Sequence, residues 1–108
     1  MAIDRVLIVG FGSMGKRHLR IARELLPNAD IRVLRYQECL SILGHESRYV
    51  ADLEQATNFA PQLAVIAGPA TFHLSAALPL ARAGVHLLVE KPLSASIDGI
   101  PQLLETCR

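Results

Sequence analysis

The chain has 108 residues, 51% of them hydrophobic and 19% charged, and its formal net charge is +1. This length suits one domain with one hydrophobic core. The balanced charge gives no basic footprint for nucleic acid or an anionic membrane surface, and no apolar run reaches the roughly 18 to 20 residues that span a bilayer. We therefore expect a protein that binds neither nucleic acid nor a membrane.

The cysteines and the N-terminus indicate the compartment. Cys39 and Cys107 have neither metal-ligand spacing nor a disulfide pattern, and the chain enters a strand pattern without the hydrophobic region of a signal peptide. We expect a reducing, cytoplasmic location and no metal site.

The first part of the chain predicts a strand, a helix and a second strand. Residues 5–9 form an uninterrupted apolar run, as in a parallel strand that is buried on both faces. Residues 14–26 then have helical periodicity, and Pro27 ends them before a short strand at 31–34. The apolar side of this helix is expected to hold Met14, His18, Ile21, Ala22 and Leu25.

The secondary structure in the middle of the chain is harder to predict from the sequence. Residues 36–48 have only weak helical character near 38–43 and a turn signal at Gly44. Residues 49–50 predict a brief third strand, and Asp52 is expected to cap a short helix with Gln55 at its third position.

The last part predicts two further strands, at 63–67 and 86–89, each followed by a helix. The first of these helices ends at Gly84 and is expected to kink at Pro79. Its expected apolar positions are Leu74, Ala77, Leu78 and Ala81, and those of the last helix are Ile100, Leu103, Leu104 and Cys107. Ser96 or Asp98 is the expected cap of the last helix, and Asp98 is favoured because Pro101 would then lie in the first turn.

Strands that alternate with helices at this spacing require right-handed crossovers. They predict a doubly wound parallel sheet of the Rossmann type, with three α/β/α layers and about five to six strands.

A glycine-rich turn joins the first strand to the first helix. Gly10, Gly12 and Gly15 form G-F-G-S-M-G, in which the first glycine permits a tight turn, the second lets a pyrophosphate approach, and the third packs helix on strand. The phosphates would meet the N–H groups and the positive dipole end of the helix. The alternative is a plain glycine-rich turn.

Arg35 follows the second strand, where the choice between dinucleotides is usually made. An acidic residue there binds the ribose hydroxyls of NAD, whereas an arginine accepts the 2′-phosphate of NADP. NADP is mildly favoured over NAD, the alternative being that Arg35 only solvates a strand end.

Glu90, Lys91 and Pro92 follow the last predicted strand at the ligand-binding edge of the sheet. The lysine could donate to a substrate hydroxyl or carbonyl, with the glutamate tuning its position and charge. Taken alone, a surface ion pair is an equally good reading.

Three blocks together resemble the Gfo/Idh/MocA oxidoreductase family over nearly the whole chain: G-F-G-S-M-G-K-R-H at 10–18, G-P-A-T-F-H at 68–73 and A-G-V-H-L-L-V-E-K-P-L at 83–93. The resemblance implies that residues 1–108 form the dinucleotide-binding domain. The family's following α/β domain, which supplies the substrate pocket, the usual acid/base residue and the dimer interface, is expected to be absent, so that this chain alone is an incomplete, inactive fragment of a homo-oligomeric enzyme.

The resemblance also implies roles for single residues. Lys91 is the catalytic residue, and it lies with Glu90 near the nicotinamide ribose and a sugar, cyclitol or related substrate. The other expected cofactor-binding residues are Phe11, Ser13 and Met14 along the pyrophosphate, Gly68 and Pro69 at a ribose, and His73 near that pocket.

Some features depart from the family pattern or leave its function open. Gly68 stands where the family often has Thr, Ser or Asn, and Arg35 replaces a common acidic residue. His18 is expected to pack or cap a helix, with His45 in a loop and His86 in a strand. A stand-alone dinucleotide sensor without catalysis, or an inactive remnant kept for interaction, remains an alternative, and exposed apolar surface would favour self-association.

Overall fold

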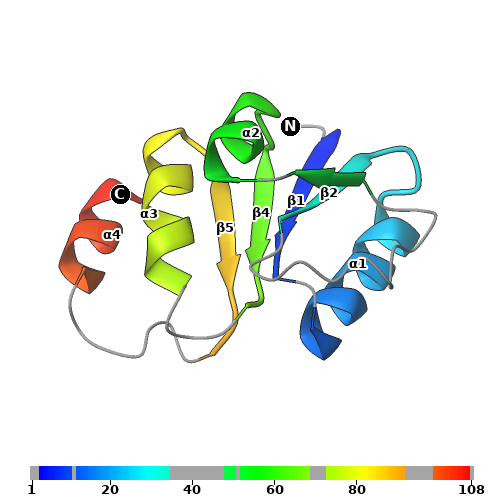
Figure 1. Cartoon of the computed structure of the whole chain (residues 1–108), viewed down its shortest axis with the longest axis horizontal. Coiled ribbons are helices and arrows are strands. Elements are labelled where there is room, and N and C mark those ends of the chain that lie inside the picture. Colours follow the sequence, from blue (N-terminus) through cyan, green and yellow to red (C-terminus); the bar gives the residue numbers. More distant parts are fainter. Residues whose placement is uncertain are drawn as a thin grey trace.

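The computed structural model describes residues 3–10, 12–34, 48–50, 52–68, 73–91 and 99–107. Along these residues strands and helices alternate, except that β3 follows β2 with no described helix between them (Figure 1). Their bounds are β1 (Arg5–Val9), α1 (Ser13–Leu25), β2 (Asp30–Leu34), β3 (Arg48–Val50), α2 (Leu53–Asn58), β4 (Leu63–Ile66), α3 (His73–Arg82), β5 (His86–Val89) and α4 (Ile100–Thr106).

The five described strands form one parallel sheet in the order β3-β2-β1-β4-β5. The chain therefore builds outward from β1 to β3, then returns to place β4 on the other side of β1. This reversal between β1 and β4 is the point at which open parallel sheets bind their ligands. The predicted Rossmann-type α/β/α fold is confirmed.

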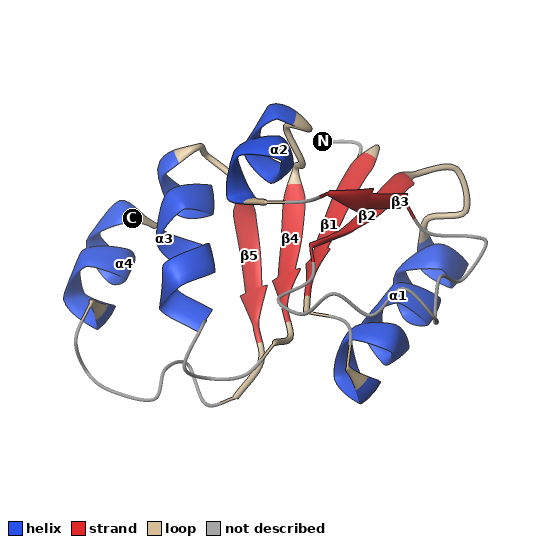
Figure 2. Ribbon diagram, viewed as in Figure 1, coloured by secondary structure: helices blue, strands red, loops and turns tan. Residues whose placement is uncertain are grey.

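The central strands of the sheet are buried on both faces, as their apolar sequences predicted, whereas β5 is exposed on one face. Side chains alternate along a strand, so Val6 and Ile8 of β1 belong to one core cluster and Leu7 and Val9 to the other. The first cluster is covered by α1, and the second by α2, α3 and α4, which lie on the opposite side of the sheet (Figure 2).

The expected apolar side of α1 was wrong in part. Met14, Ile21 and Leu25 are exposed, the last by 74%. Ala22 faces the sheet as expected, and the residues that face it with Ala22 are Gly15, Leu19 and Leu26. Gly15 decides this orientation, because α1 can touch the turn after β1 only where it has no side chain. Leu19, Ala22 and Leu26 follow Gly15 at helical spacing and therefore lie on the same face.

The other described elements begin and end within about two residues of their predicted bounds, and the weak helical character expected near 38–43 lies outside the described residues. Asp52 Oδ1 accepts a hydrogen bond of 2.8 Å from the backbone N–H of Gln55, as expected of the cap. α3 continues through Pro79, where the kink stays a prediction. The N-cap of α4 is Gly99 (φ 87°) and not Asp98, which lies outside the described residues with Ser96.

Two side-chain placements also differ from expectation at the end of the chain. Leu103 of α4 is buried, but Leu104 and Cys107 are exposed because this short helix packs against α3 along a narrow stripe. Among the helices that the structure describes, none has the length and apolar character that crossing a membrane requires.

Candidate functional site

Three strands end at the same level of the sheet. Val9, Ile66 and Val89 pair with one another across β1, β4 and β5. The ladder runs one residue further, because the N–H of Ala67 donates to Val9 O (2.8 Å) and that of Glu90 to Ile66 O (2.9 Å). The segments that follow β1, β4 and β5 thus leave the same carboxyl edge of the sheet, so the glycine turn lies at the same edge as Glu90 and Lys91.

The turn after β1 lies directly on the backbone that follows β4. Gly10 has φ +90°, and its N–H donates to Leu34 O at 2.7 Å. A Cβ atom at Gly10 would lie 2.5 Å from the backbone nitrogen of Gly68 and 3.0 Å from the carbonyl carbon of Ala67. Only glycine meets both conditions, the positive φ and the close approach of two backbones.

Gly15 is needed for packing. Its Cβ would lie 2.9 Å from the carbonyl carbon of Gly10 and still closer to the carbonyl oxygen, so α1 abuts the turn through bare backbone. This matches the task that the sequence assigned to the third glycine.

Gly12 differs from both, since neither a positive φ nor close packing against the described residues requires a glycine there. Its φ is −78°, which any residue adopts, and a Cβ there would meet nothing within 4 Å. Gly12 is also exposed. The missing side chain therefore leaves open space on the outer side of the turn, where a ligand can approach the backbone closely.

The N-terminal end of α1 has room for an anion. Gly12 is the N-cap, no side chain caps this end by a hydrogen bond, and the first turn holds no acidic residue. Ser13 and Met14 are exposed there. The first N–H groups of a helix have no partner within the helix, and with the helix dipole they favour a phosphate. The residues at this end of α1 therefore fit the pyrophosphate of a dinucleotide.

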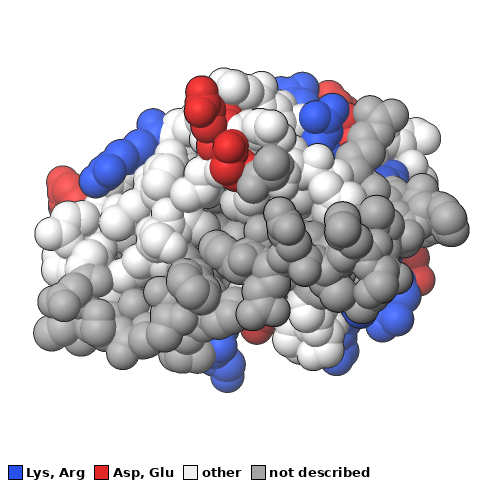
Figure 3. Space-filling model, viewed as in Figure 1, with Lys and Arg blue, Asp and Glu red and all other residues white. Residues whose placement is uncertain are grey.

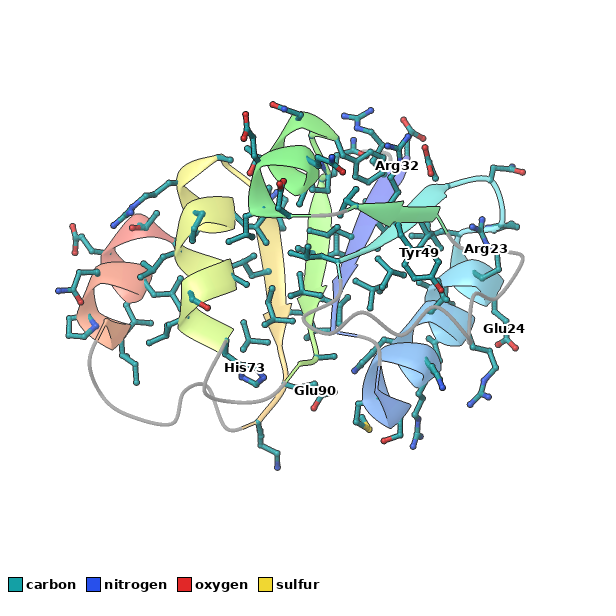
Figure 4. All side chains as sticks on the ribbon, in the orientation of Figure 1. Arg23, Glu24, Arg32, Tyr49, His73 and Glu90 are labelled. Atoms are coloured by element: carbon teal, nitrogen blue, oxygen red, sulfur yellow. The ribbon has the colours of Figure 1, made fainter. Side chains whose placement is uncertain are left out.

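His73 fixes the turn after β4. It begins α3, is only 2% exposed, and its Nε2 donates a 2.5 Å hydrogen bond to Gly68 O. A carbonyl oxygen can only accept, so Nε2 carries a proton in this arrangement. His73 points toward the carboxyl ends of the strands (Figure 4), where it holds the Gly68 backbone against Gly10.

Glu90 lies at the same edge on the other side of the sheet. Val89 packs into the core cluster under α3, so the alternation of side chains directs Glu90 toward α1. There Glu90 Oε1 accepts a hydrogen bond from Nε2 of His18, a residue that the sequence suggested only as a packing or capping histidine. The sequence holds no signal for this pair, because its members lie 72 residues apart.

The residues around Glu90 stabilise the charged form of its carboxyl group. The hydrogen bond from His18 is the main effect that lowers the pKa of the Glu90 carboxyl, and burial opposes it. The charge of His18 lowers this pKa further, as do the backbone N–H and the charge of Lys91. Lys91 itself is exposed. The site thus presents an anionic carboxylate beside an exposed ammonium group.

The remaining expected site residues, Phe11, Arg35 and Pro69, lie outside the described residues, as do Cys39 and His45. His86 is an exposed residue of β5, as predicted. Within the described ranges no three His, Cys, Asp or Glu side chains are placed to hold a metal ion. On the face that Figure 3 shows, the basic side chains of these ranges lie scattered around the outline.

Residues 5–108 match the oxidoreductase family with an NAD-binding Rossmann fold, GFO_IDH_MocA. This chain belongs to that family. The family resemblance of the three sequence blocks is thereby confirmed, and the chain is an NAD-binding oxidoreductase domain. No curated sequence matches this GFO_IDH_MocA domain.

Solved structures share the fold of this GFO_IDH_MocA domain. GenD2 from gentamicin A biosynthesis, in complex with NAD, is 28% identical with a TM-score of 0.82, covering 99% of this chain and 32% of GenD2. The WlbA dehydrogenase from Bordetella pertussis, in complex with NADH and UDP-GlcNAcA, is 20% identical with a TM-score of 0.80 (98% and 34% covered).

The myo-inositol 2-dehydrogenase from Lactobacillus plantarum is 20% identical with a TM-score of 0.77, covering 97% of this chain and 33% of that one. At 20% identity the last two likenesses show the fold alone. The chain spans about a third of the length of these structures.

Proposed function

We propose that this chain is the dinucleotide-binding part of an oxidoreductase that transfers a hydride between a nicotinamide cofactor and a sugar, cyclitol or related carbonyl or alcohol substrate. The open space at Gly12 carries the proposal, because neither backbone conformation nor internal packing requires a glycine there. The named complexes of similar structures support it: GenD2 with NAD, and WlbA with NADH and UDP-GlcNAcA.

The glycine turn would hold the pyrophosphate. Its oxygens accept hydrogen bonds from the first N–H groups of α1, beside Phe11, Ser13 and Met14. Gly68 and Pro69 border a ribose of the cofactor. His73 is buried and bonded to Gly68 O, so its contribution is to hold that backbone in place.

Lys91 is the proposed catalytic residue. The bound cofactor supplies the site that gives or accepts the hydride. The Lys91 ammonium donates a hydrogen bond to the substrate oxygen and stabilises the negative charge that develops there. A complete acid/base system needs a further group. Because the similar structures are about three times as long, we place that group and the substrate pocket in a following α/β domain, which also forms a homodimer.

We further propose that Arg35 makes NADP the preferred cofactor, because a guanidinium group pairs with a 2′-phosphate. Calorimetric titration with NADPH and NADH, at low and moderate salt, tests both parts of the proposal. We expect tighter binding of NADPH, by roughly tenfold for one charge-assisted contact, and a reversed order in Arg35→Asp.

Arg20→Asp is the matched control, since it makes the same charge change on an exposed position of α1. It should leave the ratio of the two affinities unchanged. Equal affinities for both cofactors in the wild type would remove the NADP preference, and absence of binding by either would contradict the proposed function.

A further inference from the structure

His18 and Glu90 join two parts of the proposed site that are far apart in the sequence. His18 lies on α1, the helix whose N-terminal end faces the pyrophosphate, and Glu90 begins the turn that carries Lys91. We propose that His18 is a positioning residue, which holds Glu90 and with it Lys91 at the nicotinamide end of the cofactor. This inference rests on the proposed function.

The position of His18 on α1 excludes a direct contact with the pyrophosphate. It lies six residues beyond the N-cap Gly12, or roughly 9 Å along the helix axis. Its ring extends over the sheet toward β5, which is separated from β1 by β4. His18 therefore acts through Glu90 and not on the phosphates.

The sheet offers Glu90 little other support on this side. Leu88, two residues earlier and on the same face of β5, is 52% exposed, and α1 is the helix that the described residues place over this face. The two partners are more sheltered: the side chains of His18 and Glu90 are 17% and 30% exposed. A hydrogen bond from a partly buried partner restrains a carboxylate more firmly than a fully exposed ion pair does.

The pairing also changes what Lys91 can reach. A carboxylate without a partner would compete for the ammonium group of its neighbour and hold it back from a substrate. Glu90 is instead engaged by His18, and the backbone N–H of Lys91 also stabilises its charge. This arrangement leaves the ammonium of Lys91 for the substrate oxygen.

The first test measures the pair itself, without cofactor. The pKa of the Glu90 carboxyl is followed by carbon-13 NMR in the wild type, His18→Leu, His18→Gln and the control His86→Leu, which removes an exposed histidine from β5. We expect a low pKa in the wild type and in the control, a clear rise toward the ordinary value in His18→Leu, where Lys91 still stabilises the charge, and a smaller rise in His18→Gln, whose amide can still donate. The same Glu90 pKa in His18→Leu and the wild type would overturn the proposal.

The second test separates positioning from general support of α1. NADH and ADP-ribose share the pyrophosphate, but only NADH carries nicotinamide. We expect His18→Leu to weaken NADH binding roughly threefold to tenfold while ADP-ribose binding is unchanged, and His18→Gln to recover part of the loss. Equal losses for both ligands would make His18 a structural residue and would overturn the inference.

The two tests keep this inference distinct from the proposed function. If the wild type binds neither ligand, the proposed function fails, and the role of His18 toward nicotinamide fails with it. If the wild type binds NADH more tightly than ADP-ribose but His18→Leu preserves that difference, the proposed function stands and the inference alone fails.

Discussion

At the scale of single residues, two glycines with positive φ are needed for different reasons: Gly10 in the turn after β1, and Gly84 between α3 and β5. This difference can be measured. Gly10 combines φ +90° with a Cβ position that overlaps the Gly68 backbone, whereas Gly84 has φ +83° with open space around its Cβ position. Gly84→Ala thus reports conformational strain alone, and Gly10→Ala reports strain plus collision.

We predict that Gly84→Ala lowers the free energy of unfolding by about 1 kcal/mol, and Gly10→Ala by about 3 kcal/mol or more. Urea unfolding followed by circular dichroism measures both. Equal losses in the two variants would mean that the turn after β1 can move away from β4, contrary to the packing described above.

His73 provides a second residue-scale prediction. Its buried side chain donates to Gly68 O, so His73→Leu leaves that carbonyl without its imidazole donor. We predict a loss of about 1–3 kcal/mol in the free energy of unfolding, while the exposed His86→Leu changes it by less than about 0.5 kcal/mol. Urea unfolding of both variants tests this, and a loss no larger than that of His86→Leu would contradict it.

Glu90 links stability to pH. Its carboxyl pKa is lower in the folded chain than the ordinary 4.5. A lowered pKa stabilises the folded state above the ordinary value, and the contribution is lost as pH falls through the folded pKa. We predict that stability falls more steeply below pH 4.5 in the wild type than in Glu90→Gln, as measured by urea unfolding at a series of pH values; parallel curves would contradict it.

At the scale of elements, the short helix α2 depends on its cap. Asp52 accepts a hydrogen bond from the N–H of Gln55. We predict that Asp52→Ala costs about 1 kcal/mol of unfolding free energy and that Asp52→Asn costs a few tenths, since an amide oxygen still accepts. Thermal and urea unfolding decide this, and equal effects of the two substitutions would show that the cap bond contributes nothing.

The orientation of α1 shows where periodicity alone was insufficient. The expected apolar side ran through Met14, His18, Ile21, Ala22 and Leu25, whereas the side that faces the sheet runs through Gly15, Leu19, Ala22 and Leu26, so the two sides are adjacent and share Ala22. Periodicity does not choose between them. The choice comes from Gly15, which must face the carbonyl of Gly10 for α1 to approach β1.

At the scale of the whole molecule, the sheet was predictable because its central strands β1 and β4 are short, mostly apolar runs closed by a turn, and right-handed crossovers leave few ways to connect parallel strands. The same rules place Gly10, Gly68 and Glu90 at one edge. The partner of Glu90 was not predictable, because the side chain's direction depends on register and its partner comes from a distant helix. The burial of His73 was not predicted either, although its partner Gly68 lies only five residues away, because spacing alone does not show that the start of α3 packs over the backbone that follows β4.

The central claim is that the open side of the glycine turn binds a nicotinamide dinucleotide, and Gly12→Ala tests it most directly. Calorimetric titration with NADH would compare this variant with the wild type, after urea unfolding has shown that both are fully folded under the conditions of the titration. We predict that stability falls by no more than about 1 kcal/mol, because the added methyl group meets no described atom within 4 Å and the cost is only that alanine is a poorer N-cap than glycine. We also predict at least a roughly tenfold loss of affinity, because the methyl group occupies the approach to the backbone. Binding of NADH by Gly12→Ala with the affinity of the wild type would contradict the claim.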